Sequence, residues 1–387
     1  MLLGNLLKSA SKNYKKISVK GISFDSRYVK KKDIFFAIQG DKTSGIKYID
    51  DAISKGAAAI ISGKKIKYKS NIPLLLVKDV RKSLAEACSN FYKKKPKNII
   101  AVTGTNGKSS VADFFYQILS FNKIPVASIG TLGILSKNYY KKTNLTSMDS
   151  LSLNKNLEII AKNKINNVIL EASSHGLKQK RLDNLNINTG IFTNLSHDHL
   201  DYHKSMKSYL NSKMYLFNNL LSKNSKLITD EENREFKIIK KIAKKRKIKK
   251  ITIGKNSGNI KILKNWYKEN KQIVKISFNS KVFFLEIPLI GYFQVKNLLM
   301  AILAAINCGI SKNKIFQQIY KIKPVPGRLE LVTSYNNNSN IVVDFAHTPD
   351  ALEQSLIAIK KQFKKEIILV FGCGGERDKK KDIIWEK

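Results

Sequence analysis

The sequence predicts an α/β protein with more than one domain, and three observations support that class. The chain has 387 residues, more than twice the length of a domain of about 150 residues, so we expect two or three hydrophobic cores. Hydrophobic residues make up 43% of the chain, which excludes an intrinsically disordered protein. Short apolar runs typical of strands alternate with helical stretches, as in βαβ units on a largely parallel sheet.

The first predicted domain, residues 1–94, is a small α/β unit. Strand-like runs cover Asp33–Ile38 and Pro73–Val77, and an Ala-rich segment over Asp51–Ala59 predicts a helix. Three lysines and a proline then interrupt the pattern, so we place a boundary near residue 95.

The second predicted domain, residues 95–323, alternates strands with helices. Its strand candidates are 98–102, 167–170 and 189–192. The stretch from Lys223 to Lys275 is rich in Lys, Ile and Asn. We interpret it as a solvated helix face, because no nucleic-acid-binding motif supports an RNA-contacting patch.

The third predicted domain, residues 324–387, opens at Pro324 and Pro326. Strand-like runs at 340–345 and 366–371 flank a helix. The segment is short for an independent hydrophobic core.

The chain is strongly basic, with 71 Lys and Arg against 29 Asp and Glu and a net charge of +42. A nucleic-acid partner would be one cause, because phosphate contacts by Lys and Arg give sequence-independent affinity. Only seven of the 71 are Arg, and Ile and Asn are abundant, which is typical of A/T-rich codons. We therefore expect no specific nucleic-acid partner.

Cysteine use and hydropathy predict a cytoplasmic protein. The three cysteines form no CxxC motif and no regular spacing, so they indicate neither a disulfide framework nor a zinc site. The apolar stretch at the N-terminus is too short for a signal peptide. No apolar run reaches the roughly 18 residues of a membrane helix, so we expect no membrane partner.

A glycine-rich turn is the strongest local signal. An apolar run that ends at Val102 leads into a turn and then a helix; the turn reads Gly104, Thr105, Asn106, Gly107, Lys108, Ser109 and Ser110. Val102 stands where G-x-x-x-x-G-K-[ST] has its first glycine. The context still favours phosphate binding over a plain strand-to-helix turn: glycines expose backbone N–H groups, Lys108 supplies charge, and the Ser109 hydroxyl can bind Mg²⁺.

The five histidines (175, 197, 199, 203 and 347) sit in polar motifs at the ends of apolar runs. The first four lie within 29 residues and follow two strand candidates, beside acidic residues. Ligands bind at the C-terminal ends of parallel strands, so a metal-nucleotide site is favoured over scattered surface histidines.

Seven further motifs occur in one order over nearly the full chain: Asp25-Ser26-Arg27, Gly130-Thr131-Leu132-Gly133, EASSHGL at 171–177, HDHLDYH at 197–203, Val325-Pro326-Gly327-Arg328, DFAHTPDAL at 344–352 and FGCGGERDK at 371–379. With the GTNGKSS turn at 104–110, they make the chain resemble the Mur ligase family. Within the family, the chain is most similar to the ligases that add the third amino acid to the peptidoglycan precursor.

The resemblance implies a three-domain architecture: an N-terminal domain for the uridine nucleotide, a central P-loop-type ATPase and a Rossmann-like C-terminal domain. It also implies ATP-driven amide formation in the cytoplasm by a monomer acting on small-molecule substrates. The carboxylate of UDP-MurNAc-L-Ala-D-Glu would attack ATP to give an acyl phosphate, and the amine of a diamino acid would then displace phosphate. Meso-diaminopimelate is favoured over L-lysine.

The resemblance also assigns catalytic and metal-binding residues. Ser109 and Glu171 would bind one Mg²⁺, and Glu171 with His199 would hold a second. Lys213 matches a lysine that the family carbamylates to N6-carboxylysine, which can approach Mg²⁺. Lys108 would neutralise charge during phosphoryl transfer.

The remaining assignments concern the substrates. For ATP they are Gly104 to Ser110, Asn297, Arg328 and Asp344, with His347 close by. For the UDP-substrate they are Asp25, Ser26, Arg27, Thr146, Ser147, Ser173, Gln179 and Arg181. Arg377 would receive the carboxylate of the incoming amino acid.

The chain departs from the family after Lys381. The family continues well beyond this point with a DNPR-type motif that selects the amino acid, so we expect an incomplete C-terminal domain. Adding one base to the A-rich codons of the preceding lysines restores the family's Arg-x-x-Met-Gly spacing, which suggests that the last six residues are out of frame. A folylpolyglutamate synthase-like ligase and a non-catalytic nucleotide-binding remnant are the alternatives.

Overall fold

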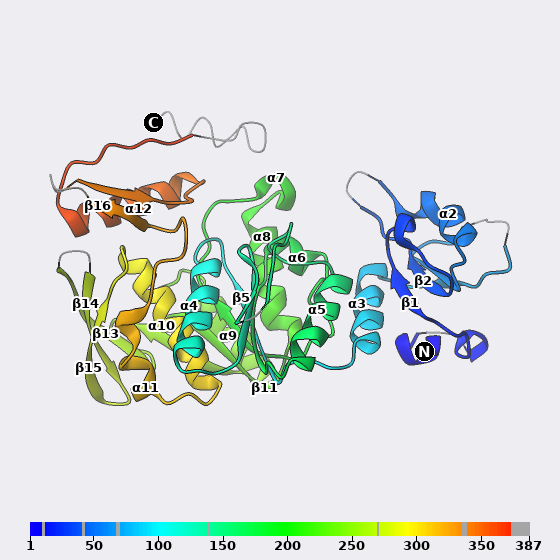
Figure 1. The fold of residues 1–387 in the computed structure, drawn as a ribbon, viewed down its shortest axis with the longest axis horizontal. Helices are drawn as coiled ribbons and strands as arrows, with labels where there is room; N and C mark the ends of the chain where they lie inside the picture. Colours follow the sequence, from blue (N-terminus) through cyan, green and yellow to red (C-terminus); the bar gives the residue numbers. More distant parts are fainter. Residues whose placement is uncertain are drawn as a thin grey trace. The chain divides into compact units, whose positions relative to one another are not determined.

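The computed structural model describes residues 1–9, 12–40, 43–66, 70–137, 139–268, 271–334 and 339–372 (Figure 1). It divides into two compact units. The first unit contains Met1–Pro96, Met148–Lys164 and Gly176–Leu185, and the second contains Lys97–Ser147, Ile165–His175 and Asn186–Lys387. The division into domains at 1–94, 95–323 and 324–387 stays a prediction.

The first unit is built on a four-stranded parallel sheet in the order β1-β2-β3-β4. Its strands are β1 (Gly21–Ser23), β2 (Asp33–Phe36), β3 (Ala59–Ser62) and β4 (Leu74–Leu76). Its α-helices are α1 (Leu3–Leu6), α2 (Ile49–Ser54), α3 (Val80–Phe91) and α5 (Ser150–Lys162). Neighbouring residues of β2 enter different cores, Ile34 on the side of α1 and α3 and Phe35 on the side of α2, because side chains alternate along a strand.

The helix predicted over Asp51–Ala59 is wrong in its second half. Helix α2 ends at Ser54, and Gly56 follows with a φ of 85°, in the left-handed region that ends helices. Ala59 instead begins β3, whose buried residues pair with both β2 and β4. The strands predicted at 33–38 and 73–77 are confirmed, although β2 ends at Phe36 and β4 at Leu76.

The second unit is built on an eleven-stranded sheet in the order β15-β14-β13-β12-β11-β10-β5-β9-β6-β7-β8. Its middle, from β13 to β6, is parallel, and both ends are antiparallel. The strands are β5 (Asn98–Thr103), β6 (Val126–Gly130), β7 (Gly133–Ser136), β8 (Tyr139–Lys141), β9 (Asn167–Glu171), β10 (Ile187–Phe192), β11 (Leu221–Asp230), β12 (Lys249–Gly254), β13 (Ile260–Lys268), β14 (Lys271–Phe278) and β15 (Lys281–Ile287). The prediction of a largely parallel sheet is confirmed.

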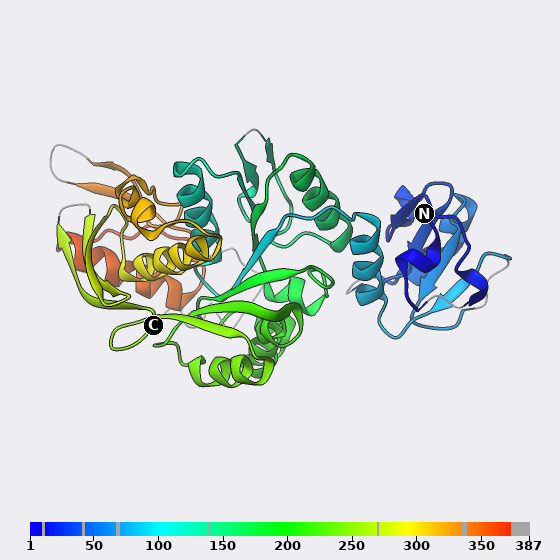
Figure 2. The same cartoon turned by 90° about the horizontal axis from the view of Figure 1, so that it is seen from below.

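Helices α4 (Lys108–Phe121) and α10 (Tyr292–Asn307) pack beside each other against this sheet (Figures 1 and 2). Both contribute to one core with Ile100, Ile169 and Ile191 of the central strands. Before the C-terminal segment, the second unit also contains α7 (Leu200–His203), α8 (Met206–Tyr215), α9 (Phe236–Arg246) and α11 (Lys312–Phe316). Helix α6 (Ser174–Lys178) has residues in both units.

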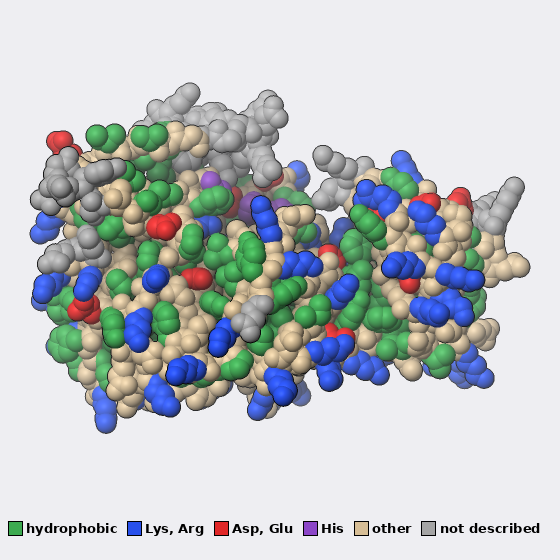
Figure 3. Space-filling model, viewed as in Figure 1, with side chains coloured by type: hydrophobic (Ala, Val, Ile, Leu, Met, Phe, Trp, Pro, Cys, Tyr) green, Lys and Arg blue, Asp and Glu red, His purple; other side chains and the backbone are tan. Residues whose placement is uncertain are grey.

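The interpretation of the lysine-rich stretch 223–275 as a solvated helix face is only partly confirmed. Helix α9 buries Ile239 and Ile242 and exposes Lys244 and Lys245, so a solvated helix face is confirmed there. Most of the stretch instead forms β11 to β14, because residues of β14 alternate between buried and partly exposed with the period of a strand. Figure 3 shows Lys and Arg spread over the visible face rather than gathered in one stripe.

The C-terminal segment, residues 324–372, adds an antiparallel hairpin of β16 (Glu330–Ser334) and β17 (Asn340–Val343), followed by α12 (Pro349–Phe363). The strand predicted at 340–345 is confirmed as β17, but the one at 366–371 is wrong. Those residues take no regular structure, because the described part of this sheet holds only β16 and β17 and offers them no ladder partner. Ile368 and Val370 are consequently 93% and 91% exposed.

Across the described ranges, no helix is both long and apolar enough to cross a membrane.

Candidate active site at the glycine-rich turn

The glycine-rich turn joins β5, which is buried between β9 and β10, to the first turn of α4. Two of its residues must be glycine. A Cβ on Gly104 would lie 1.8 Å from Thr193 Oγ1, and one on Gly107 would lie 2.6 Å from Asn297 Oδ1. Gly107 also has a φ of 85°, in the region that favours glycine. The turn therefore brings bare backbone to the N-terminus of a 14-residue helix, which suits an anion.

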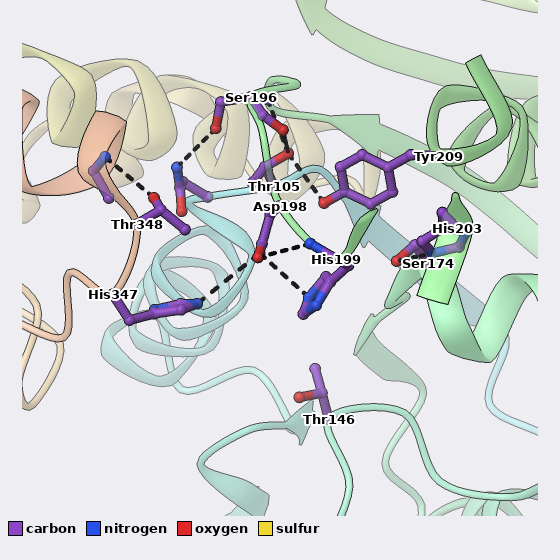
Figure 4. Close-up of polar contacts among 12 residues, drawn as sticks. Thr105, Thr146, Ser174, Ser196, Asp198, His199, His203, Tyr209, His347 and Thr348 are labelled. Carbon is purple, nitrogen blue, oxygen red and sulfur yellow. Dashed lines mark hydrogen bonds and ion pairs between the residues drawn. The ribbon is translucent and has the colours of Figure 1, made fainter. Parts of the chain in front are cut away.

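Hydrogen bonds from the segment after β10 fix the shape of the turn. The backbone N–H of Asn106 donates to Asn194 Oδ1 at 2.9 Å, and Thr193 Oγ1 donates to the Asn106 carbonyl at 2.6 Å. Thr105 Oγ1 accepts from the Ser196 N–H at 3.0 Å and lies 3.2 Å from the Tyr209 hydroxyl (Figure 4). The phosphate-binding shape is thus held before any ligand arrives.

Lys108 extends back over this turn. Its ammonium donates to the carbonyls of Gly104 at 2.9 Å and Thr105 at 2.8 Å. Burial lowers the pKa of Lys108, while Glu171 and Asp198 oppose that effect. The predicted phosphate-binding residues therefore converge in space.

Glu171 ends β9 and points its carboxylate at the same turn. It is 3% exposed, and its Oε2 accepts from Ser109 Oγ at 3.1 Å. Thr131 donates to the same carboxylate through its backbone N–H at 2.8 Å and its hydroxyl at 3.2 Å. The pairing of Ser109 with Glu171, expected for one Mg²⁺, is present.

Two of the predicted histidines flank one buried carboxylate. Asp198 Oδ2 lies 3.3 Å from His199 Nε2 and 3.9 Å from His347 Nε2 (Figure 4). Burial lowers the pKa of His199 to about 4, although Asp198 acts in the opposite direction. His199 is therefore uncharged at neutral pH, as a metal-binding imidazole must be.

Lys213, on α8, is 1% exposed. Its Nζ lies 4.2 Å from the centre of the Tyr209 ring. The Asp198 carboxylate acts on this group electrostatically and favours its charged form. Burial and the like charge of Lys108 lower the pKa of Lys213 well below its usual range. This shift favours the neutral amine over the ammonium.

The other residues predicted to contact ATP surround the turn or lie in the C-terminal segment. Asn297 contacts Gly107 and donates to Gln294 Oε1 at 3.1 Å. The Arg328 guanidinium stacks 4.4 Å above the Phe345 ring, and burial lowers its pKa while Asp344 and Glu171 oppose that shift. Both oxygens of Asp344 accept hydrogen bonds, from the Leu329 N–H and the Ser355 hydroxyl.

The residues predicted to contact the UDP-substrate are divided between the two units. Thr146, Ser147 and Ser173 lie around Glu171: Ser147 Oγ donates to the Glu171 carbonyl at 2.7 Å and accepts from the Ser173 N–H at 2.8 Å. Thr146 Oγ1 lies 3.3 Å from the hydroxyl oxygen of Thr131.

In the first unit, Asp25 and Arg27 form an ion pair at 2.7 Å beside Ser26, and the Arg27 side chain is 77% exposed. Gln179 Oε1 accepts from Arg181 Nη2 at 2.7 Å. Arg377 lies outside the described residues.

The pairing of Ser109 with Glu171 fits part of a Mg²⁺ site. In the part of the chain that the structure describes, no group of three or more His, Cys, Asp or Glu side chains is placed to hold a metal ion. Mg²⁺ in nucleotide-dependent enzymes usually takes one or two carboxylates and completes its shell with phosphates and water. A carboxylate already bonded to the hydroxyl beside the phosphate turn matches that need.

Comparison with known proteins identifies the family. The profile of the Mur ligase middle domain matches residues 102–305, that of the Mur ligase family catalytic domain matches 18–92, and that of the Mur ligase glutamate ligase domain matches 327–386. A UDP-N-acetylmuramoyl-L-alanyl-D-glutamate--2,6-diaminopimelate ligase from Rickettsia montanensis is 42% identical over 372 residues, covering 94% of this chain and 76% of the relative. The chain belongs to the Mur ligase family.

Solved Mur ligases share the fold. A structure of UDP-N-acetylmuramoyl-L-alanyl-D-glutamate--2,6-diaminopimelate ligase matches with a TM-score of 0.82 and 29% identity, over 98% of this chain and 78% of its own. The MurF ligase of Thermotoga maritima in complex with ADP matches with a TM-score of 0.62 and 20% identity, over 89% of this chain and 75% of its own. The three-domain Mur ligase architecture expected from the motifs is confirmed.

The structure of this Mur ligase also reveals site residues that the sequence did not single out. Thr131 bonds Glu171, Asp198 holds His199, and Tyr209 lies between Thr105 and Lys213. Thr131 and Asp198 fall inside motifs that were recognised, so their position in a motif was an available signal. Tyr209 lies four residues before Lys213 on α8, and nothing in its surroundings in the sequence distinguishes it.

Proposed function

We propose that this chain is an ATP-dependent ligase that joins meso-diaminopimelate to UDP-MurNAc-L-Ala-D-Glu. The observation that carries the proposal is the convergence of Lys108, in the turn after β5, and Glu171, at the end of the neighbouring strand β9, with the buried Lys213 electrostatically coupled to Lys108. The diaminopimelate specificity comes from the relatives, whose printed names state it.

Phosphoryl transfer from ATP depends mainly on positioning and charge neutralisation. Backbone N–H groups of the turn would bind the phosphates, Lys108 would move from its two carbonyl partners to the phosphate oxygens, and Asn297 would contact the base. Mg²⁺, held by Ser109, Glu171 and His199, would supply positive charge next to the transferred group. The substrate carboxylate attacks the γ-phosphate and ADP leaves. The incoming amine then attacks the carbonyl carbon of the acyl phosphate, loses a proton and forms the amide as inorganic phosphate leaves.

Lys213 would act as a carbamate. An uncharged amine adds to CO₂ and loses a proton, which converts it into a carboxylate-like group able to bind Mg²⁺. Burial and the like charge of Lys108 lower the pKa of Lys213, which favours the neutral amine that this addition requires, although Asp198 opposes the shift.

Different groups of residues would contact different parts of the substrates. Asp25, Ser26 and Arg27, in the predicted domain 1–94, would contact the uridine end. Thr146 and Ser147 would contact the middle of the substrate, and Ser173, Gln179 and Arg181 its peptide end. Arg328, Asp344 and His347 would complete the ATP site from the domain 324–387, and Arg377 would bind the carboxylate of the amino acid. A cytoplasmic location and a monomeric state stay predictions.

The test is phosphate release by purified protein with ATP, Mg²⁺ and UDP-MurNAc-L-Ala-D-Glu. We expect release with meso-diaminopimelate and little with L-lysine, and an amide product by mass spectrometry. Release only with folate and L-glutamate would support the folylpolyglutamate alternative. ATP binding without release for any pair would contradict the proposal and favour a nucleotide-binding remnant.

A further inference from the structure

His203 is the one of the four clustered histidines that is sealed inside the protein. It ends helix α7 and is 1% exposed, and each of its ring nitrogens lies beside a hydroxyl. Nε2 lies 3.0 Å from Ser174 Oγ (Figure 4), and Nδ1 lies 3.2 Å from Ser212 Oγ. Ser174 follows Glu171 by three residues, and Ser212 precedes Lys213 by one.

We propose that His203 is a positioning residue that fixes the helix carrying Lys213 against the loop that follows Glu171. The proposal rests on the proposed function, because it concerns two groups assigned to that reaction. His203 is 1% exposed and both of its ring nitrogens face serine hydroxyls of the protein, so His203 acts through these neighbours.

The hydrogen-bond pattern determines which ring nitrogen carries the proton. Ser212 Oγ donates its single hydrogen to the Ser208 carbonyl at 2.9 Å, so it can only accept from His203. Nδ1 must therefore be the protonated nitrogen. In the neutral ring Nε2 is then an acceptor, and the Ser174 hydroxyl donates to it.

A continuous chain of contacts runs from His203 to the backbone of Glu171. Ser174 is next to Ser173, whose N–H donates to Ser147 Oγ at 2.8 Å, and Ser147 Oγ donates to the Glu171 carbonyl at 2.7 Å. On its other side, the His203 ring lies 5.0 Å from the ring of Tyr209, which in turn contacts Lys213 Nζ.

The backbone conformation on both sides of helix α7 needs side-chain contacts that stabilise it. Helix α7 has only four residues, and its flanking residues His199 and Lys204 have φ values of 53° and 66°. Left-handed residues at both ends cost energy and persist only where surrounding contacts hold them. The imidazole provides contacts to both neighbouring segments at once.

The first experiment measures the tautomer without requiring turnover. In protein with ¹⁵N-labelled histidine, the signal lost in His203→Asn belongs to His203. We expect the pattern of a neutral ring protonated at Nδ1, and we expect Ser212→Ala to change it. A ring protonated at Nε2, or at both nitrogens, would overturn the proposed hydrogen-bond chain.

The second experiment separates positioning from folding. His203→Phe should lower kcat about 100-fold, the order expected when a reacting group is displaced by about 1 Å, and leave KM for ATP within about threefold. His203→Asn retains a hydrogen-bond donor on the Nδ1 side, so its kcat should be about tenfold higher than that of His203→Phe. His197→Asn, which changes an exposed histidine of the same motif, is the matched control and should keep kcat within about twofold.

A third readout monitors Lys213 directly. With ¹³C-bicarbonate, the carbamate signal of Lys213 should weaken in His203→Phe and persist in His197→Asn. Unchanged kcat and carbamate in a folded His203→Phe would refute the positioning role. If the wild-type protein forms no amide, the proposed function fails, and the tautomer and carbamate signals then decide on His203 separately.

Discussion

The phosphate-turn end of the central sheet and the C-terminal segment 324–372 belong to the same unit but hold their functional groups differently. At the turn, Lys108 and Glu171 each make at least two hydrogen bonds at the ends of fully buried strands. In the C-terminal segment, the His347 side chain is 51% exposed and Phe345 is 57% exposed. The small core at this segment has three buried apolar residues: Leu329 and Ala358 from the segment, and Ile290 from the chain before it.

This difference separates two tasks. Groups whose chemistry requires a shifted pKa, such as Lys213 and His199, need the low dielectric of a buried position. Groups that recognise a nucleotide need access to it, and they can lie on a segment with a smaller core. We therefore expect substitutions at the strand ends to lower kcat and substitutions in the C-terminal segment to raise KM for ATP.

Lys108→Met is expected to have the largest effect. It removes the charge beside the phosphate turn, and loss of such a group costs roughly 10³ to 10⁴ in kcat. Steady-state phosphate release measures the loss. Lys123→Met, at an exposed lysine just after the same helix, is the matched control and should keep wild-type kcat. Equal kcat values for the two variants would contradict the expectation that the groups at the phosphate turn control kcat.

Lys213→Met should lower kcat by about 10³ and also stabilise the protein. Because folding lowers the pKa of Lys213, protonation of this amine favours the unfolded chain, which penalises folding below the unfolded pKa. Methionine removes this penalty, and we expect Tm to rise by roughly 2–4 °C at pH 7. A lower Tm measured by calorimetry would contradict the inference that burial of this amine destabilises the folded protein.

Arg328→Lys tests the C-terminal side of the comparison. A lysine keeps the charge but loses the planar fork that stacks on Phe345, so KM for ATP should rise about tenfold. The value of kcat should change less than threefold. A fall in kcat of the size expected for Lys108→Met would show that the two regions do not divide the tasks as described.

Asp113→Asn should have the smallest effect, and only on stability. Asp113 is buried on α4, and burial raises its pKa to about 6, with Gln117 opposing that shift. The folded state then favours the protonated acid, so wild-type stability falls as pH rises from about 4 through 6. Asparagine should raise Tm by roughly 2–4 °C at pH 7, with no gain near pH 4. Melting curves at the two pH values check this, and kcat should be unchanged.

Much of the site could be predicted because strand ends and glycines leave a clear pattern in the sequence. A buried strand followed by Glu171 and another followed by His199 indicated one edge of a parallel sheet, and Ser109 meets Glu171 there. The burial of His203 could not be predicted, since it depends on how α7 and α8 pack. Nor could the irregular course of 366–371, whose apolar composition favours a strand but whose pairing depends on a partner elsewhere.

The central claim is that the substrate carboxylate attacks ATP at the turn held by Lys108 and Glu171. It is tested most directly with UDP-MurNAc-L-Ala-D-Glu carrying ¹⁸O in both oxygens of the acceptor carboxylate. An acyl phosphate requires one of these oxygens to leave with phosphate, so each phosphate released should carry one ¹⁸O by mass spectrometry. Amide formation with unlabelled phosphate would contradict the account.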